Sequence, residues 1–343
     1  MQKRWQLTIG ILALAIAPLA GQDKYAKVAE IPIGGAGGFD YLTVDSDAKR
    51  LYLAHSTEVV VVDTEKNAVI GRIADTPGVH GVAAVGSMGR VFTTNGRENK
   101  VAIVDAKTLA TTAKVDTGQN PDAVNYDPTR KEIWSWNHTG HSATAIDAAT
   151  GKVNATVPLS GVAESGGIDG GRAFVNIEDK DAIDVIDTAK YEVVAHWPVA
   201  PADSPTGMAV DTARHRLFVG GGPNLVMMDS ASGKVVAHVP ICTGTDGTAY
   251  DPSAKLVFVS CSDGKMTIAR ADGPDTLSVV QTLETARGAR TVAVDPATHR
   301  VYVAAVSYAA PDPNAPPPAA GQRPARPAPI PDSLKVLVFG PGK

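Results

Sequence analysis

The sequence predicts an all-β protein, a β-propeller of seven four-stranded blades. The main observation is a unit of about forty residues that occurs seven times, because this period is typical of propeller blades. Each unit contains an apolar tetrad that begins with an aromatic residue, and successive aromatics lie 40, 42, 40, 44, 40 and 44 residues apart. Outside the extreme N-terminus, no long segment has the 3.6-residue hydrophobic period of a helix. The seven tetrads begin at Tyr52, Phe92, Trp134, Phe174, Phe218, Phe258 and Tyr302.

Each unit divides into four predicted strands. The first strand ends at or near an acidic turn, as in 42–45, and the tetrad belongs to the second. The third strand is apolar and usually closed by Asp, as in 59–63, and the fourth follows a hairpin such as 148–152. Val, Ile, Thr and aromatic residues dominate the strands, with Gly, Asp, Asn and Pro between them. This composition is typical of sheet interrupted by tight turns.

The two ends of the chain are expected to close the ring. The seventh unit reaches its third strand at 334–339, and no residues are left for a fourth. The missing strand is predicted at 27–33, before the first complete unit. Pairing of these two segments in one blade would cover the exposed sheet edge at the seam. We therefore predict a single propeller domain over 25–343.

The tetrads, the Asp that ends the first strand and the Asp that ends the third resemble the YVTN-repeat β-propeller family, with YncE-like proteins as the nearest match. The resemblance covers essentially everything after residue 24. Two departures are visible: the fourth tetrad position is Asn only at Asn95 and Asn137, and Arg270 replaces the third-strand Asp. The resemblance implies a seven-bladed, secreted or periplasmic propeller, often a binding module without established chemistry. Such a fold does not by itself determine function.

The N-terminus has the pattern of a secretory signal peptide. Basic residues occur at positions 3 and 4, an apolar run covers 7–20, and small residues at 20 and 21 offer a cleavage site, so 1–21 is assigned to the leader. The run is shorter than the ~20 residues that span a bilayer, which disfavours the alternative of a membrane anchor. Hydrophobic residues make up 44% of the chain and charged residues 20%, which fits a folded globular protein. We expect a periplasmic or secreted monomer without stable membrane insertion after cleavage.

Two local features fall in the sixth and seventh units. Cys242 and Cys261 are the only cysteines; an oxidising compartment favours a disulfide between them, with two unbonded thiols as the alternative. A metal thiolate site is disfavoured because CxxC spacing is absent. The last unit also carries a Pro- and Ala-rich loop insertion at 307–333. This composition favours extended polyproline conformations, either as a disordered loop or as a lid or docking arm over the channel mouth.

The repeat also predicts a ring of polar side chains at one mouth of the central channel. Counting back five residues from the position that ends the first strand gives one residue in each blade. Four of these seven residues are carboxylates, which is more polar than packing requires. Polar lining of a water-filled channel is the simpler alternative, and a ligand or ion site the functional one. The ring positions are Asp40, His80, Asp122, Glu164, Thr206, Asp246 and Arg290.

The fourth tetrad position is expected to form an outer ring on the same face. Its polar members, His55, Asn95 and Asn137, occur in the first three units, and His138 follows in the third. We place the functional sector in blades one to three, together with the ring Arg of blade seven. The predicted ligand-binding residues are Asp40, His55, His80, Asn95, Asp122, Asn137, His138, Glu164, Asp246 and Arg290.

A divalent cation is one candidate ligand for this sector. Imidazole with carboxylate is a donor set for a transition metal, and carboxylate with amide oxygen is one for calcium. The candidate metal ligands are His55, His80, Asp122 and Glu164.

Two classes of function remain after the motif search. The chain contains no GxSxG, no phosphate loop and no HExxH. A net charge of −4 and an acidic ring disfavour nucleic acid, which needs a basic groove with aromatic platforms. The leading hypothesis is a non-catalytic binding or scaffold propeller that recognises a small ligand, an ion or a protein on the channel face. The alternative is a lactonase-type hydrolase in which a cation polarises a carbonyl and activates water, with His80 or Glu164 as base.

Overall fold

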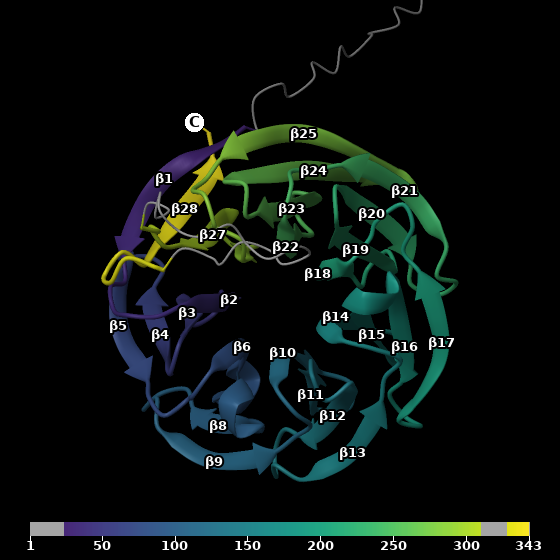
Figure 1. The fold of residues 1–343 in the computed structure, drawn as a ribbon, viewed down its shortest axis with the longest axis horizontal. Coiled ribbons are helices and arrows are strands. Elements are labelled where there is room, and N and C mark those ends of the chain that lie inside the picture. The colour runs from purple at the N-terminus through teal and green to yellow at the C-terminus, as the bar shows by residue number, and fades with distance from the viewer. Residues whose placement is uncertain (1–23, 310–327, 343) are drawn as a thin grey trace, which may run out of the picture.

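The computed structural model describes residues 24–309 and 328–342, which form a closed ring of seven four-stranded antiparallel sheets (Figure 1). The predicted all-β, seven-bladed propeller is therefore confirmed. The predicted leader at 1–21 and the middle of the Pro-rich insertion lie outside the described residues. Within the described ranges, we find no helix with the length and apolar character that crossing a membrane requires.

Blades one to three follow one another along the chain, each with its first strand at the channel. Blade one contains β2 (Phe39–Asp45), β3 (Arg50–His55), β4 (Glu58–Asp63) and β5 (Ala68–Ile73). Blade two contains β6 (Val79–Val85), β7 (Arg90–Asn95), β8 (Lys100–Asp105) and β9 (Thr111–Asp116), with short 3-10 helices η1 (Gly86–Met88) and η2 (Gly96–Glu98). Blade three contains β10 (Pro121–Asp127), β11 (Glu132–Asn137), β12 (Ser142–Asp147) and β13 (Val153–Pro158).

Blades four to seven continue the same order around the ring. Blade four contains β14 (Ala163–Asp169), β15 (Arg172–Ile177), the 3-10 helix η3 (Glu178–Lys180), β16 (Ala182–Asp187) and β17 (Glu192–Pro198). Blade five contains β18 (Pro205–Asp211), β19 (Arg216–Gly221), β20 (Asn224–Asp229) and β21 (Val235–Pro240). Blade six contains β22 (Thr245–Asp251), β23 (Leu256–Cys261), β24 (Lys265–Gly273) and β25 (Thr276–Glu284). Blade seven contains β26 (Val292–Asp295), β27 (Arg300–Ala305), β28 (Lys335–Pro341) and β1 (Tyr25–Pro32).

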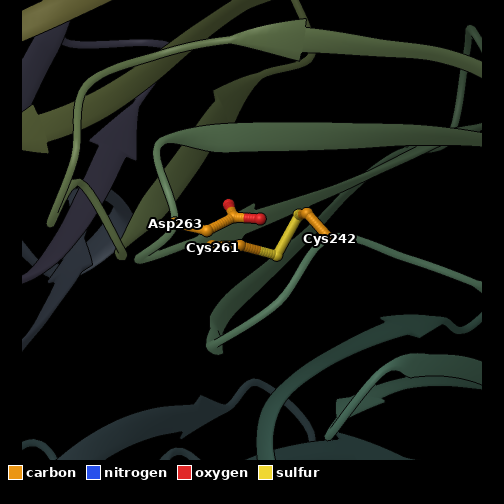
Figure 2. A group of neighbouring side chains, drawn as sticks. All are labelled: Cys242, Cys261 and Asp263. Carbon is orange, nitrogen blue, oxygen red and sulfur yellow. A yellow bond between two sulfur atoms is a disulfide. The ribbon is translucent and has the colours of Figure 1, made fainter.

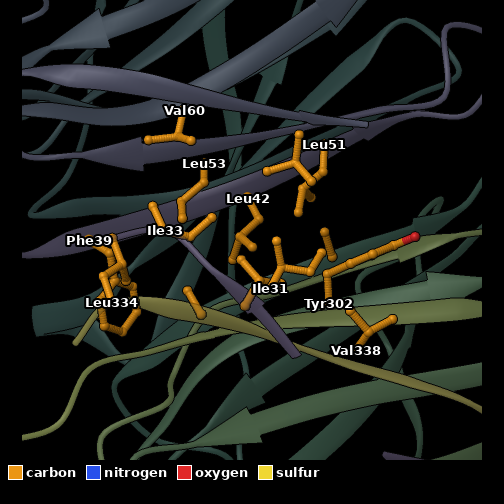
Figure 3. Close-up of a cluster of buried hydrophobic side chains, with 14 of the residues drawn as sticks. Ile31, Ile33, Phe39, Leu42, Leu51, Leu53, Val60, Tyr302, Leu334 and Val338 are labelled. Atoms are coloured by element: carbon orange, nitrogen blue, oxygen red, sulfur yellow. The ribbon is translucent and has the colours of Figure 1, made fainter. Parts of the chain in front are cut away.

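Strands from both ends of the chain close blade seven. β1 pairs antiparallel with β28, and this pairing runs from Tyr25↔Pro341 to Pro32↔Lys335. The two predicted strands therefore pair as expected, with their limits shifted by one or two residues. Ile31 of β1 is fully buried in a cluster that joins blade seven to blade one (Figure 3). The N-terminal strand thus contributes both backbone pairing and core packing at the seam.

The hydrophobic core lies between adjacent blades. A representative cluster combines Trp134 and Trp136 of β11 with Val175 and Ile177 of β15. The two Trp rings are fully buried, with centroids 6.0 Å apart. They pack one blade against the next, and their burial makes them unavailable as stacking platforms for nucleic-acid bases.

The Asp residues that close the third strands have a structural role. Asp147 accepts hydrogen bonds from the backbone N–H groups of Ala149, at 3.0 Å, and Thr150, at 2.7 Å. Hydrogen bonds from the hydroxyl and the N–H of Thr150 lower the pKa of this carboxyl. In blade six, where Arg270 replaces the Asp, the hairpin instead continues to the pair Gly273↔Thr276. The same turn recurs at Asp63, Asp105, Asp187 and Asp229.

Candidate functional site

The seven ring positions line one cavity at a mouth of the central channel, which we call the mouth cavity. It has a volume of about 470 Å³ and is lined from all seven blades. A smaller cavity of about 180 Å³ between the inner strands has no charged lining residue. The mouth cavity is lined by Asp40, His80, Asn120, Asp122, His138, Glu164, Glu178, Thr206, Gly244, Thr245, Asp246, Ser262 and Arg290.

An irregularity of the first strand coincides with the ring position in six blades. The register between first and second strands shifts between Phe39 and Leu42 in blade one, and between Val79 and Val82 in blade two. Equivalent shifts occur in blades three to six. Bulges of this kind redirect a side chain away from the regular pleat. They explain how one residue in each of these blades reaches the cavity.

His80 lies between two carboxylates of neighbouring blades. Its Nδ1 is 2.6 Å from Oδ2 of Asp40 and 3.7 Å from Oδ1 of Asp122. The opposite edge of the ring lies against Gly96, where an added Cβ would be 2.8 Å from Nε2. The absence of a side chain at Gly96 therefore leaves room for the imidazole in this position.

A second group is formed by Asp122, His138 and Glu164. Oδ1 of Asp122 is buried and accepts no hydrogen bond from any residue that the structure describes, and the residue is only 8% exposed. Nε2 of His138 is 3.6 Å from Oε2 of Glu164 and 4.0 Å from Oε2 of Glu178. The hydroxyl of Tyr41 donates a hydrogen bond of 3.5 Å to Oε1 of Glu164. This side of the cavity thus concentrates acceptors with few donors.

Burial and mutual repulsion raise the pKa values of these acids. Burial, followed by the charge of Glu164, raises the pKa of Asp122 well above its usual range. Burial, followed by the charge of Asp246, raises the pKa of Glu164 to about 8. Burial also lowers the pKa of His138, since a buried imidazole favours the neutral form. The ionised form of these two acids is therefore costly in this cavity unless a positive charge lies beside it.

The other side of the mouth cavity already contains a positive charge. Nε of Arg290 is 2.9 Å from Oδ2 of Asp246, and its guanidinium lies 5.7 Å from the centre of the Phe39 ring. The positive charge of Arg290 therefore offsets the carboxylate of Asp246, on the side of the cavity formed by blades six and seven. The excess of acidic groups therefore lies toward blades one to four.

Three of the predicted site residues lie inside their blades, which corrects the expected outer ring. His55, Asn95 and Asn137 are almost completely buried and do not line the mouth cavity. Nδ2 of Asn95 donates to Oε1 of Glu98 at 2.7 Å, and Nδ2 of Asn137 donates to Oγ of Ser142 at 3.1 Å. The Asn137 bond joins the facing ends of β11 and β12, and the Asn95 bond ties the end of β7 to η2. His55 is accordingly removed from the metal-ligand set.

The outer part of the cavity is formed one residue later in the repeat. His138, Glu178 and Ser262 directly follow the tetrads of blades three, four and six, and all three line the cavity. Each of the three lies just beyond the end of its second strand, in the turn or 3-10 helix that follows, whereas the last strand residue is buried in the blade. Sequence reasoning included His138 but missed Glu178 and Ser262. Comparing the residues that directly follow the seven tetrads would have identified both.

The structure joins Cys242 and Cys261 through a disulfide (Figure 2). Cys261 occupies the fourth tetrad position of blade six and is fully buried, like its counterparts Asn95 and Asn137. Asp263 lies beside the bridge, but its carboxylate accepts the backbone N–H of Thr243 at 3.1 Å. Because both sulfur atoms are already bonded to each other, this group does not form a metal site.

The described ends of the Pro-rich insertion lie on the side of the mouth cavity. Tyr308 packs against Gly288, in the loop that precedes the ring residue Arg290. The backbone N–H of Gly35 donates to Oδ1 of Asp332 at 2.9 Å, which ties the end of the insertion to blade one. The centre of the insertion, 310–327, lies outside the described residues.

Comparisons with known proteins identify the architecture. No family model matches the chain, and no curated protein matches it. A solved structure of hydrazine synthase from Kuenenia stuttgartiensis is similar, with a TM-score of 0.69 and 17% identity over 78% of this chain and 92% of that chain. A chain of a mitotic checkpoint complex is also similar, with a TM-score of 0.69 and 12% identity over 88% of this chain and 95% of that one. At these identities the likeness shows the seven-bladed propeller fold alone, a fold that supports binding or scaffold roles in general.

Proposed function

We propose that this protein is an exported, YncE-like binding propeller that recognises a small cationic or polar ligand, or an ion, in the mouth cavity. The observation that carries the proposal is the buried Oδ1 of Asp122, which has no hydrogen-bond donor within 24–309 and 328–342 and belongs to a residue that lines a polar cavity of about 470 Å³. A concave site with convergent polar groups is the usual place for a ligand. An unpaired buried acceptor is costly unless a ligand or solvent satisfies it.

The charge distribution supports a cationic ligand. Asp40, Asp122, Glu164 and Glu178 lie toward blades one to four, where His80 and His138 are the basic lining residues. A low-dielectric cavity of this kind attracts and retains positive charge. The export of the protein is proposed from the basic and apolar N-terminal pattern at 1–21.

The lactonase-type alternative has weaker support. Asn95 and Asn137 are the residue types that could add amide oxygens to carboxylates around such a cation, but both side chains are buried and hydrogen-bonded inside their own blades. Glu164 and Asp40 do line the cavity, but carboxylates alone serve binding as well as catalysis. We therefore place binding first.

The test is thermal denaturation in the presence of a defined panel of putrescine, spermidine, choline and divalent cations. At least one member should raise the melting temperature of the wild type in a saturable way. The double variant Asp122→Asn/Glu164→Gln keeps the shape of both side chains and should lose that response. If no member stabilises the wild type, or if the double variant responds equally, the mouth cavity is not the binding site.

A further inference from the structure

We infer that Asp122, His138 and Glu164 form a site for one divalent transition-metal ion, with the His80–Asp40 pair beside it. This inference rests on the proposed binding function and names its ligand. One ligand atom from each of the three residues can be chosen so that all lie within 4.8 Å of one another. Around a tetrahedral zinc ion, with bonds of about 2.0–2.2 Å, ligand atoms lie roughly 3.3 Å apart. The required contraction is therefore at most about 1.5 Å.

The separation of His138 and Glu164 is already close to that value. Nε2 of His138 and Oε2 of Glu164 are 3.6 Å apart, which is too long for a hydrogen bond but suits two ligands of one ion. Asp122 adds the buried Oδ1, for which the described part of the chain provides no hydrogen-bond donor. A bound cation would satisfy this atom and lie between the two carboxylates, whose negative charges otherwise repel each other.

A neighbouring group of Asp40, His80 and Asp122 is less suited to hold the ion directly. Nδ1 of His80 is 2.6 Å from Asp40, so this nitrogen is already engaged in a short charge-assisted contact. The ring is also confined on its far edge by Gly96. We therefore assign His80 and Asp40 to the surroundings of the ion, where they would help to position Asp122.

The donor set favours a transition metal over calcium or magnesium. Imidazole nitrogen is a ligand for zinc, nickel, copper and iron, whereas calcium takes six to eight oxygen atoms. One nitrogen and two carboxylates leave at least one coordination position open toward the cavity. The same ion would therefore remain accessible to a further small ligand.

The experiment is calorimetric titration of EDTA-treated protein, purified without a histidine tag, with Zn²⁺ and separately with Co²⁺. We expect one ion per chain, a cobalt absorption spectrum typical of bound ion, and no competition from equal concentrations of Ca²⁺ or Mg²⁺. Glu164→Gln and His138→Gln should each weaken Zn²⁺ binding by about tenfold or more. Their melting temperatures, measured without metal, check that the variants fold.

Two further variants distinguish specific metal coordination from nonspecific attraction of cations to an acidic cavity. His196→Gln changes another carboxylate-paired histidine, 2.6 Å from Asp184 on the outer part of blade four, and should leave zinc binding unchanged. Asp246→Asn makes the same acid-to-amide change as Glu164→Gln, but on the opposite side of the cavity, and should weaken binding several-fold less. Equal effects of Asp246→Asn and Glu164→Gln would overturn the proposed coordination.

The outcomes also distinguish this inference from the proposed function. If Zn²⁺ and Co²⁺ do not bind but putrescine or choline does, the metal site is wrong and the binding function stands. If neither the metals nor the organic cations bind, both proposals fall. Zinc binding that is lost in His196→Gln but kept in His138→Gln would place the ion outside the cavity and overturn the inference.

Discussion

The substitution Glu164→Gln should stabilise the metal-free protein at high pH. The pKa of Glu164 is raised to about 8, from an ordinary value of 4.5, first by burial and then by the charge of Asp246. Between these two pH values the folded protein binds this proton and the unfolded chain does not, so stability falls as pH rises through the window. Gln cannot ionise, so the variant is free of this loss.

The pKa shift of Glu164 sets the upper limit of the gain in unfolding free energy that Glu164→Gln can give. At about 1.4 kcal/mol per pKa unit, the shift from 4.5 to about 8 corresponds to roughly 5 kcal/mol. The measured gain should be smaller, because the neighbouring acid Asp122 also takes up protons in the same cavity. We expect almost no difference between variant and wild type at pH 4, and a gain of a few kcal/mol above pH 8.

The assay is urea unfolding followed by tryptophan fluorescence at pH 4, 6, 7 and 8.5, with EDTA present. Glu65→Gln is the matched control, because this side chain is 64% exposed and should change stability by less than about 0.5 kcal/mol at every pH. A difference between Glu164→Gln and wild type that stays constant with pH would refute the reasoning. So would a variant that is less stable than wild type at pH 8.5.

Three further predictions concern the fold. The Cys242–Cys261 bridge closes a loop of 19 positions and should add about 3 kcal/mol to the free energy of unfolding. Urea unfolding with and without reductant measures this contribution. Two reactive thiols in unfolded, unreduced protein would disprove the bridge. Ile31→Ala should lower the free energy of unfolding in urea by about 2–5 kcal/mol, because the side chain is fully buried at the seam. Val28→Ala, at an exposed position of the same strand, should cost little, and equal losses would contradict the packing argument. Asp147→Ala should cost about 1 kcal/mol at pH 7. Because the pKa of Asp147 is lowered from its ordinary value of 3.8, this cost should shrink as pH falls below that value; a pH-independent loss would show that the turn hydrogen bonds are not its source.

The inner ring was predictable from the sequence because every blade repeats the same register. A fixed offset from the end of the first strand selected seven residues, and the structure places all of them around one cavity. The outer ring was misplaced by one position, since Asn137 packs inside its blade and His138 reaches the cavity. Asn137 is the last residue of β11, and His138 begins the turn that follows. The repeat pattern locates the strand end, but it does not show whether the last strand residue or the first turn residue reaches the cavity.

The sequence by itself determined the number of blades, the strand order and the closure of the ring, because these follow from the period of the repeat and from the strands at its two ends. Only the tertiary structure decided the chemistry of the mouth cavity. The proximity of Asp122 to Glu164 and His138 depends on first-strand bulges and on the approach of neighbouring blades. Such contacts join residues 16 and 42 positions apart, and burial and repulsion in the cavity raise the pKa values of the two acids, which local sequence patterns do not encode.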